Sequence, residues 1–247
     1  MEGTSDAERV CAALQWDVAD PSIQIEPLVT LPHSYVARVR RSSEAPLLFK
    51  QAGSPDFASG VRKELIVNRD VLSRFSAPVG PAFVTGDESA VMPWILFEDL
   101  TVSHAAPRSQ PPPYSQIEAF VASLARTHAQ ARSLPLPELF ANVAGDVRVA
   151  DGAEDVPRVL DTFLQEVEEV DDDRFPPRSY ELVRRIRDNI PAIARMLGDD
   201  ETLVHGDAHF ANALYAADGA LLIDWALAVI GPGEVDLAHA LAMYLPR

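Results

Sequence analysis

The sequence is poor in cysteine, in lysine and in long apolar runs. Its single cysteine, Cys11, cannot form an intrachain disulfide, which suits a reducing compartment. No stretch reaches the roughly 18 consecutive apolar residues that a membrane helix needs, and residues 1–10 lack the basic and apolar segments of a secretory signal. From these absences we expect a cytoplasmic protein with no membrane partner.

Positive charge is scarce as well. The 247 residues include 21 Lys and Arg against 37 Asp and Glu, a formal net charge of −16. A surface of this charge repels a phosphate backbone, so we expect no nucleic-acid partner, and it mildly favours a cationic small molecule. Only two of the 21 basic residues are lysines, Lys50 and Lys63, so a lysine in this chain invites a specific explanation.

The first hundred residues have the pattern of a β-rich unit. The apolar content of 47 % is sufficient for a buried core. Apolar residues alternate with polar ones at 23–25 and again at 35–39, and an apolar run that ends in a lysine follows at 46–50. This pattern predicts three short strands in an antiparallel meander.

A helix and a hairpin are predicted next. Residues 60–75 have apolar side chains at helical spacing, and Glu64 lies along the same inward stripe. Residues 83–100 are typical of a hairpin, with its turn at Gly86 and Asp87 and an apolar second strand at 90–97.

The amino-acid composition changes after Leu100. A proline-rich loop follows, which we interpret as the boundary between an N-terminal β-rich lobe, residues 1–100, and a helical C-terminal lobe, residues 101–247. Ser115 and Glu118 have the spacing of a capping box at the start of a helix. The other predicted elements are helices near 156–170 and 179–197, a strand at 203–204, a hairpin that turns at Asp218 and Gly219, and a last helix from residue 234.

The stretch LVHGDAHFANALYA, residues 203–216, has two interpretations. His205, Asp207 and His209 alternate, so on an extended strand they would share one face and could bind a zinc or iron ion. Alternatively, Asp207 precedes Asn212 by five residues. That is the spacing of the catalytic loop of protein kinases, where the Asp orients the acceptor hydroxyl and the Asn binds magnesium.

The rest of the sequence favours phosphoryl transfer. This reaction needs a cation on the phosphates, an anion to hold that cation, a carboxylate for the acceptor hydroxyl, and magnesium ligands. Candidates occur in that order: Lys50, Glu64, Asp207, and then Asn212 with Asp224. The zinc interpretation has no evident fourth ligand and leaves Lys50 and Glu64 without a role.

Three segments resemble motifs of the aminoglycoside phosphotransferase and choline-kinase-like superfamily, which includes ecdysteroid-kinase-like proteins. They are HGDAHFAN (205–212), LLIDW (221–225) and GPGEVDLAHAL (231–241). The resemblance extends to LLFK (47–50), RKELIVNRDVL (62–72), ILFEDL (95–100) and LARTHA (124–129), and so covers about residues 23–245.

This resemblance implies an α+β, two-lobed protein-kinase-like fold, with an antiparallel sheet and one helix in the N-terminal lobe and mainly helices in the C-terminal lobe. It also implies ATP and Mg²⁺ as cofactors. Asp207 would be the catalytic carboxylate, Asn212 and Asp224 the magnesium ligands, and Lys50 the contact to the α- and β-phosphates, held by Glu64.

The resemblance also implies roles for supporting residues. Adenine would bind to hinge backbone near Glu98 and Leu100. Ser34 or nearby backbone would cover the phosphates, because the turn that does this in relatives has no glycine here. His205 and Asp236 would support the catalytic loop. Relatives continue with further helices beyond the last one, so we expect a C-terminal lobe that is truncated, minimal or completed by a partner.

We therefore predict an ATP- and magnesium-dependent O-phosphotransferase that acts on a hydroxyl of a small molecule. An aminoglycoside or another antibiotic, with a role in resistance, and an amino alcohol are the acceptors considered. The alternative is a nucleotide-binding pseudokinase or regulatory module without turnover, and a zinc hydrolase is a more distant one.

Overall fold

The computed structural model describes residues 6–42, 44–107, 112–141, 143, 148–149, 158, 160–162, 164–165, 177–196 and 201–244. The helix predicted near 156–170 falls largely outside these ranges. Within them, no helix is both long and apolar enough to cross a membrane.

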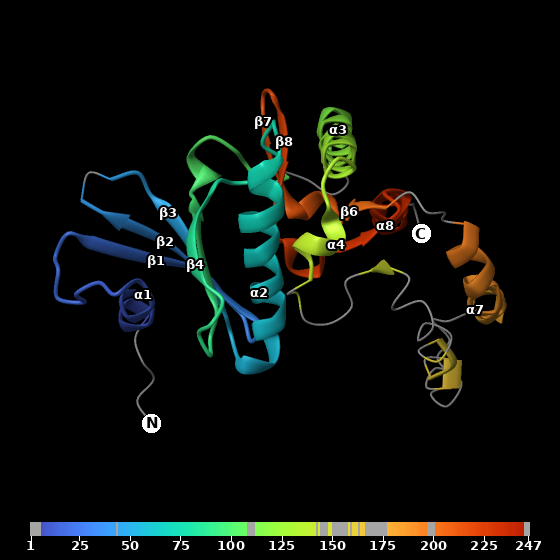
Figure 1. Ribbon diagram of the computed structural model, residues 1–247, viewed down its shortest axis with the longest axis horizontal. Coiled ribbons are helices and arrows are strands. Elements are labelled where there is room, and N and C mark those ends of the chain that lie inside the picture. Colours follow the sequence, from blue (N-terminus) through green and yellow to red (C-terminus); the bar gives the residue numbers. More distant parts are fainter. Residues whose placement is uncertain are drawn as a thin grey trace.

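A five-stranded antiparallel sheet forms the N-terminal part of the protein (Figure 1). Its strands are β1 (Ile23–Thr30), β2 (Ser34–Arg41), β3 (Leu47–Ala52), β4 (Phe83–Asp87) and β5 (Trp94–Glu98). They lie in the order β1-β2-β3-β5-β4, so β5 is an internal strand and β4 is an edge strand. The predicted meander of the first three strands is confirmed.

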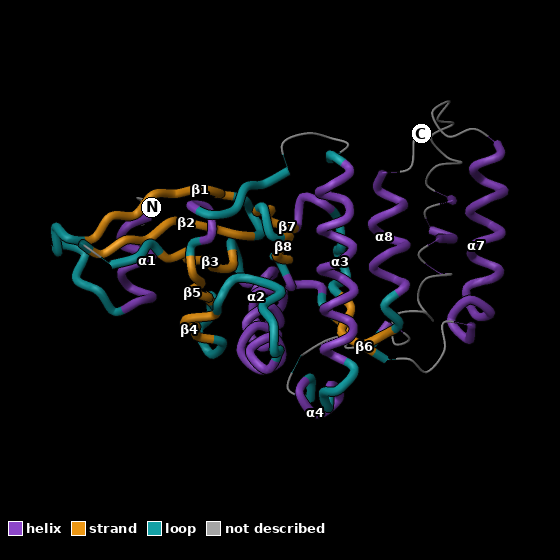
Figure 2. The backbone as a smooth tube through the Cα atoms, turned by 90° about the horizontal axis from the view of Figure 1, so that it is seen from above, coloured by secondary structure: helices purple, strands orange, loops and turns teal. Residues whose placement is uncertain are grey.

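The sheet has two apolar faces because successive side chains of a strand point to opposite sides. The helix α1 (Asp6–Leu14), which was not predicted from the sequence, covers one face through Val10. The helix α2 (Ala58–Ile66) covers the other face (Figures 1 and 2). Along β3 this alternation places Phe49 against α1 and Lys50 on the side of α2.

The chain remains helical beyond α2, through a π-helical turn (Val67–Val71) and a 3-10 turn (Leu72–Arg74). The prediction for the following hairpin was wrong about its turn and about the start of its second strand. Gly86 and Asp87 belong to β4 and pair with β5, which begins at Trp94 and not at residue 90. The reason is that Asp87 Oδ1 accepts the backbone N–H groups of Ser89 and Ala90, which folds these residues into a longer turn.

The C-terminal part is mainly helical (Figure 2). Its helices are α3 (Tyr114–Ala131), α4 (Leu136–Leu139), α7 (Pro177–Met196) and α8 (Glu234–Tyr244). Two small antiparallel pairs lie among them, β6 (Thr202–Val204) with β9 (Val229–Gly231), and β7 (Ala213–Ala216) with β8 (Gly219–Leu222). One large core joins α3, these strands and the π-helical turn after α2, so the helical segment that covers the five-stranded sheet also packs against the C-terminal part.

The predicted capping box at the start of α3 was wrong. The helix begins at Tyr114 after Pro113, with no side-chain cap. The fixed φ of proline, −58° here, already suits the entry to a helix, so the helix starts before Ser115. Ser115 and Glu118 are consequently exposed residues of the first two turns.

Candidate active site

Lys50 connects the sheet, α2 and the segment after β8. Its Nζ lies 2.6 Å from Glu64 Oε2 and 2.9 Å from Asp224 Oδ1. The contact with Glu64, expected from the alternation of the strand and the spacing of the helix, is present. Glu64 also accepts a hydrogen bond from the backbone of Trp225. The three charged side chains thus hold α2 against the segment that carries Asp224.

Burial and charge fix the protonation of these groups. The side chains of Lys50 and Glu64 are only 13 % and 3 % exposed, and that of Asp224 is 47 % exposed. Burial alone would lower the pKa of Lys50, but the two carboxylates outweigh it and raise that pKa. Burial would raise the pKa of Asp224, and Lys50 more than offsets this and lowers it. Lys50 is therefore a cation and Asp224 an anion at neutral pH.

Asp224 has a left-handed backbone conformation, with φ 65° and ψ 67°. This conformation is uncommon for a residue other than glycine and costs roughly 1–2 kcal/mol. The backbone N–H of Ile223 donates to Asn212 O at 3.0 Å, which pins the segment to the catalytic loop. The strained turn directs the Asp224 carboxylate toward Lys50, and backbone strain of this kind is frequent at functional sites.

A cavity of about 350 Å³ opens beside Lys50, and we name it the hinge cavity. Its walls come from β1 to β3, from α2, from the segment after β5 and from the β7–β8 hairpin. The predicted site residues among its lining are Ser34, Lys50, Glu64, Glu98, Leu100 and Asp224. Asp207 and Asn212 do not line it and lie on the adjoining loop. The structure thus gathers six of the eight predicted site residues around one cavity.

The backbone at the end of β5 is fixed by a buried acid, Asp99, for which the sequence pattern indicated no distinct role. Asp99 Oδ1 accepts the N–H of Thr101 at 2.9 Å, and Asp99 Oδ2 accepts Arg38 Nε at 2.6 Å. Arg38 also donates to Glu26 on β1. Burial would raise the pKa of Asp99, but Thr101 and Arg38 outweigh it and lower that pKa. The network ties the β1–β2 hairpin to the hinge.

The turn between β1 and β2 contains no glycine, but it packs closely against Gly53. Its closure is made by reciprocal backbone hydrogen bonds of 2.9 and 3.2 Å between Leu31 and Ser34. A Cβ on Gly53, just after β3, would lie 2.3 Å from Pro32 O. Gly53 therefore provides the close approach that the turn sequence itself did not indicate.

Asp207 and Asn212 meet on the loop after β6, as their spacing indicated. Asn212 Nδ2 donates to Asp207 Oδ2 at 2.9 Å and to Asp207 O at 3.0 Å. Two imidazoles flank the same carboxylate: His209 Nε2 lies 3.4 Å from Oδ2, and His239 Nε2 lies 3.4 Å from Oδ1. The sequence had indicated no role for His239, and for His209 only that of a candidate zinc or iron ligand. His209 is next to the carboxylate, and His239 reaches it from α8.

A second, fully buried carboxylate braces this loop. Asp236 accepts the backbone N–H groups of His205 and Gly206 at 2.8 and 3.1 Å, and contacts His128 Nε2 at 3.0 Å. His205 Nε2 lies 2.9 Å from Ile223 O. Burial lowers the pKa of His205, which favours its neutral form. His205 and Asp236 thus make contacts of the kind expected from residues that support the catalytic loop.

The geometry disfavours the zinc interpretation. The strand β6 ends at Val204, and Gly206 has φ +80°, so His205, Asp207 and His209 do not share the face of one extended strand. The imidazole of His205 is directed to the carbonyl of Ile223. Within the described ranges no group of three or more His, Cys, Asp or Glu side chains could hold a metal ion.

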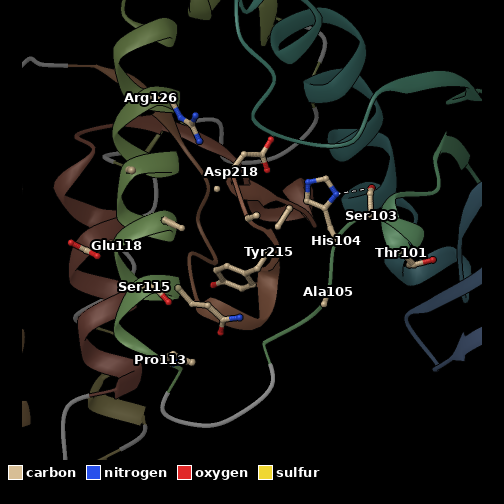
Figure 3. A pocket seen from close by; sticks show the side chains of 16 residues that line it. Thr101, Ser103, His104, Ala105, Pro113, Ser115, Glu118, Arg126, Tyr215 and Asp218 are labelled. Carbon is tan, nitrogen blue, oxygen red and sulfur yellow. Dashed lines mark hydrogen bonds between the residues drawn. The ribbon is translucent and has the colours of Figure 1, made fainter.

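A second cavity, of about 990 Å³, lies elsewhere (Figure 3). It is bounded by α3, by the linker after the hinge and by the β7–β8 hairpin, and we name it the outer cavity. Arg126, Asp218 and His104 line it, and His104 is hydrogen-bonded to Ser103. It contains none of the predicted site residues, so its size does not identify it as the centre of the chemistry.

The fold is similar to that of several solved small-molecule phosphotransferases, and this likeness shows a kinase-like fold. The GDP complex of aminoglycoside 2'-phosphotransferase-IIIa has a TM-score of 0.65 at 17 % identity, over 96 % of this chain and 78 % of that one. A thermostable mutant of aminoglycoside phosphotransferase APH(4)-Ia with ADP and hygromycin B gives 0.61 at 15 %, over 96 % and 76 %. A choline/ethanolamine kinase family protein from Mesorhizobium loti gives 0.59 at 12 %, over 95 % and 68 %.

The sequence identifies the family directly. The chain belongs to the phosphotransferase enzyme family (APH), whose family model matches residues 32–247. A search of curated proteins finds no match.

Proposed function

We propose that the protein is an ATP- and Mg²⁺-dependent O-phosphotransferase for a hydroxyl group of a small molecule. The observation that carries the proposal is the bridge of Lys50 between Glu64 and Asp224 at the hinge cavity, next to the Asp207–Asn212 pair. These are the cation, anion, carboxylate and metal-ligand groups that phosphoryl transfer requires.

The hinge cavity would hold the nucleotide. Backbone at Glu98 and Leu100, fixed by the Asp99 network, would bind adenine. Lys50 would contact the α- and β-phosphates and Glu64 would keep it extended. Ser34 and the backbone of its turn would cover the phosphates. A volume of about 350 Å³ is at the lower end of the range for small-molecule sites.

The donor set beside Asp224 fits magnesium. Asn212 uses its amide nitrogen on Asp207, so its amide oxygen is the ligand atom that faces away from Asp207. Asp224 is ionised and half exposed. Oxygen ligands from one or two side chains, completed by phosphates and water, are what Mg²⁺ prefers. Bound there, Mg²⁺ would neutralise the charge of the β- and γ-phosphates.

Asp207 would orient the acceptor. Its carboxylate accepts a hydrogen bond from the acceptor hydroxyl and aims that oxygen at the γ-phosphorus. As the new O–P bond forms, the bond from the γ-phosphorus to the bridging oxygen breaks and ADP leaves. The hydroxyl proton passes to Asp207 and then to water. Asn212 holds the carboxylate in place throughout.

We propose the acceptor class from the names of the structural neighbours. One neighbour was solved with hygromycin B, and others are named a macrolide 2'-phosphotransferase and a choline/ethanolamine kinase family protein. Hydroxylated antibiotics, with a role in resistance, and amino alcohols are therefore the acceptors to test first. The acidic surface favours cationic members of both groups. Dependence on ATP agrees with the cytoplasmic location expected from the sequence.

The test is ADP formation from MgATP, and separately MgGTP, over a panel of aminoglycosides, hygromycin B, macrolides, choline, ethanolamine and sugars. We expect one chemical group to stimulate turnover, and Asp224→Asn to abolish it while thermal unfolding stays cooperative. Binding of MgATP without transfer to any acceptor would instead support the nucleotide-binding module without turnover.

A further inference from the structure

The helix α8 reaches the catalytic loop at two points on one face. Asp236, in its first turn, holds the backbone N–H groups of His205 and Gly206. His239 lies three residues later and therefore on the same face of the helix. Its Nε2 lies 3.4 Å from Asp207 Oδ1. One contact fixes the backbone before Asp207 and the other touches the carboxylate itself.

The two oxygens of Asp207 are engaged from different elements. Oδ2 faces the catalytic loop, with Asn212 Nδ2 at 2.9 Å and His209 Nε2 at 3.4 Å. Oδ1 faces His239 on α8. The Nε2 atom of His239 is buried and has no hydrogen-bond partner in the described part of the chain, although its side chain is 37 % exposed. The Asp207 carboxylate is thus the group that this nitrogen addresses.

We propose that His239 is a positioning residue for phosphoryl transfer. It holds Asp207 Oδ1 from α8, so that the carboxylate keeps the orientation in which it can accept the hydrogen bond of the acceptor hydroxyl. This role rests on the proposed function. Asn212 and His209 contact Oδ2 from the catalytic loop itself, whereas His239 contacts Oδ1 from a separate helix, so the carboxylate is restrained from both sides. Such orientation affects the transfer step and leaves nucleotide binding unchanged.

Kinetics of paired variants test this role. His239→Leu removes the donor and His239→Gln places an amide nitrogen near the former Nε2. With MgATP and the most active acceptor of the panel, we expect His239→Leu to lower kcat roughly tenfold, the lower end for the loss of a polar contact to a charged group. The KM for MgATP should change less than about twofold, and His239→Gln should recover most of kcat.

His104→Leu is the matched control, because His104 lines the outer cavity and contacts Ser103. It should have the kcat of the unchanged protein. A wild-type kcat for His239→Leu would overturn the inference. So would a His239→Gln variant as slow as His239→Leu, because the effect would then be one of packing.

A spectroscopic readout separates this inference from the proposed function. In ¹⁵N-histidine spectra at one pH, Asp207→Asn should shift the Nε2 resonance of His239, whereas Glu118→Gln on α3 should not. An unshifted resonance would contradict the contact. If the unchanged protein transfers phosphate to no acceptor, the proposed function fails and this role with it. If the unchanged protein transfers phosphate and the His239 variants have the same kcat, the role of His239 fails and the proposed function stands.

Discussion

Glu64→Gln isolates the charge that holds Lys50. The substitution keeps the size of the side chain, which is 3 % exposed, and removes one of the two carboxylates that contact Nζ, the one at 2.6 Å. A hydrogen bond to a charged group contributes about 1.5–3 kcal/mol. Lys50 would then remain on Asp224, away from the phosphates, so kcat/KM for MgATP should fall roughly 10- to 100-fold.

The stability of the fold should change little by comparison. Burial raises the pKa of Glu64 by more than Lys50 lowers it, so Glu64→Gln removes a desolvation cost together with the contact, and the free energy of unfolding should shift by about 1 kcal/mol or less. Steady-state kinetics and chemical denaturation measure the two effects on one preparation. Glu118→Gln, an exposed glutamate of α3, is the control and should alter neither. A Glu64→Gln variant with unchanged kcat/KM would refute the assignment of Lys50 and Glu64.

Two further predictions concern stability, both followed by urea denaturation. Gly206→Ala should lower the free energy of unfolding by more than about 2 kcal/mol, because φ is +80° and the new Cβ would lie 2.1 Å from Leu227 O. Gly60→Ala lies in α2 and its Cβ would have only a 3.5 Å contact, so it should instead raise the free energy of unfolding by about 1 kcal/mol. Equal effects of the two substitutions would contradict the reasoning. The folded-state pKa of Asp99 is lowered by Thr101 and Arg38 against the effect of burial. The stability from these contacts is therefore present above the ordinary carboxyl pKa of about 4 and is lost as the pH falls from there through the lower folded-state pKa. Asp99→Asn should therefore be less stable near pH 7, by about 2 kcal/mol, and lose less stability on acidification; parallel pH curves would contradict this.

Much of the N-terminal part could be predicted because local patterns decide it. Strand alternation and helical spacing placed Lys50 and Glu64 on facing sides, and the contact is present. The helix α1 was missed because it is nine residues long in an acidic terminus, and burial of Val10 against the sheet accompanies its formation. The start of β5 was misplaced because the side chain of Asp87, not the strand pattern, decides the turn.

In the site, too, the contacts between residues close in the sequence were predictable and the long-range contacts were not. Asp207 and Asn212 are five residues apart, so the sequence shows their relation directly. Arg38 and Asp99 are 61 residues apart on separate elements, and neither residue type marks a contact by itself. His239 has the same difficulty: its spacing from Asp236 indicates a shared helix face, and only the packing of α8 on the loop shows that this face meets Asp207.

Transfer of the γ-phosphoryl group from labelled MgATP to a hydroxyl compound, compared between the unchanged protein and Asp207→Ala, tests the central claim most directly. We predict a phosphorylated product with the unchanged protein and none above background with Asp207→Ala, while both bind MgATP and unfold cooperatively. Equal transfer by the two proteins, or MgATP binding with no transfer by either, would contradict the account.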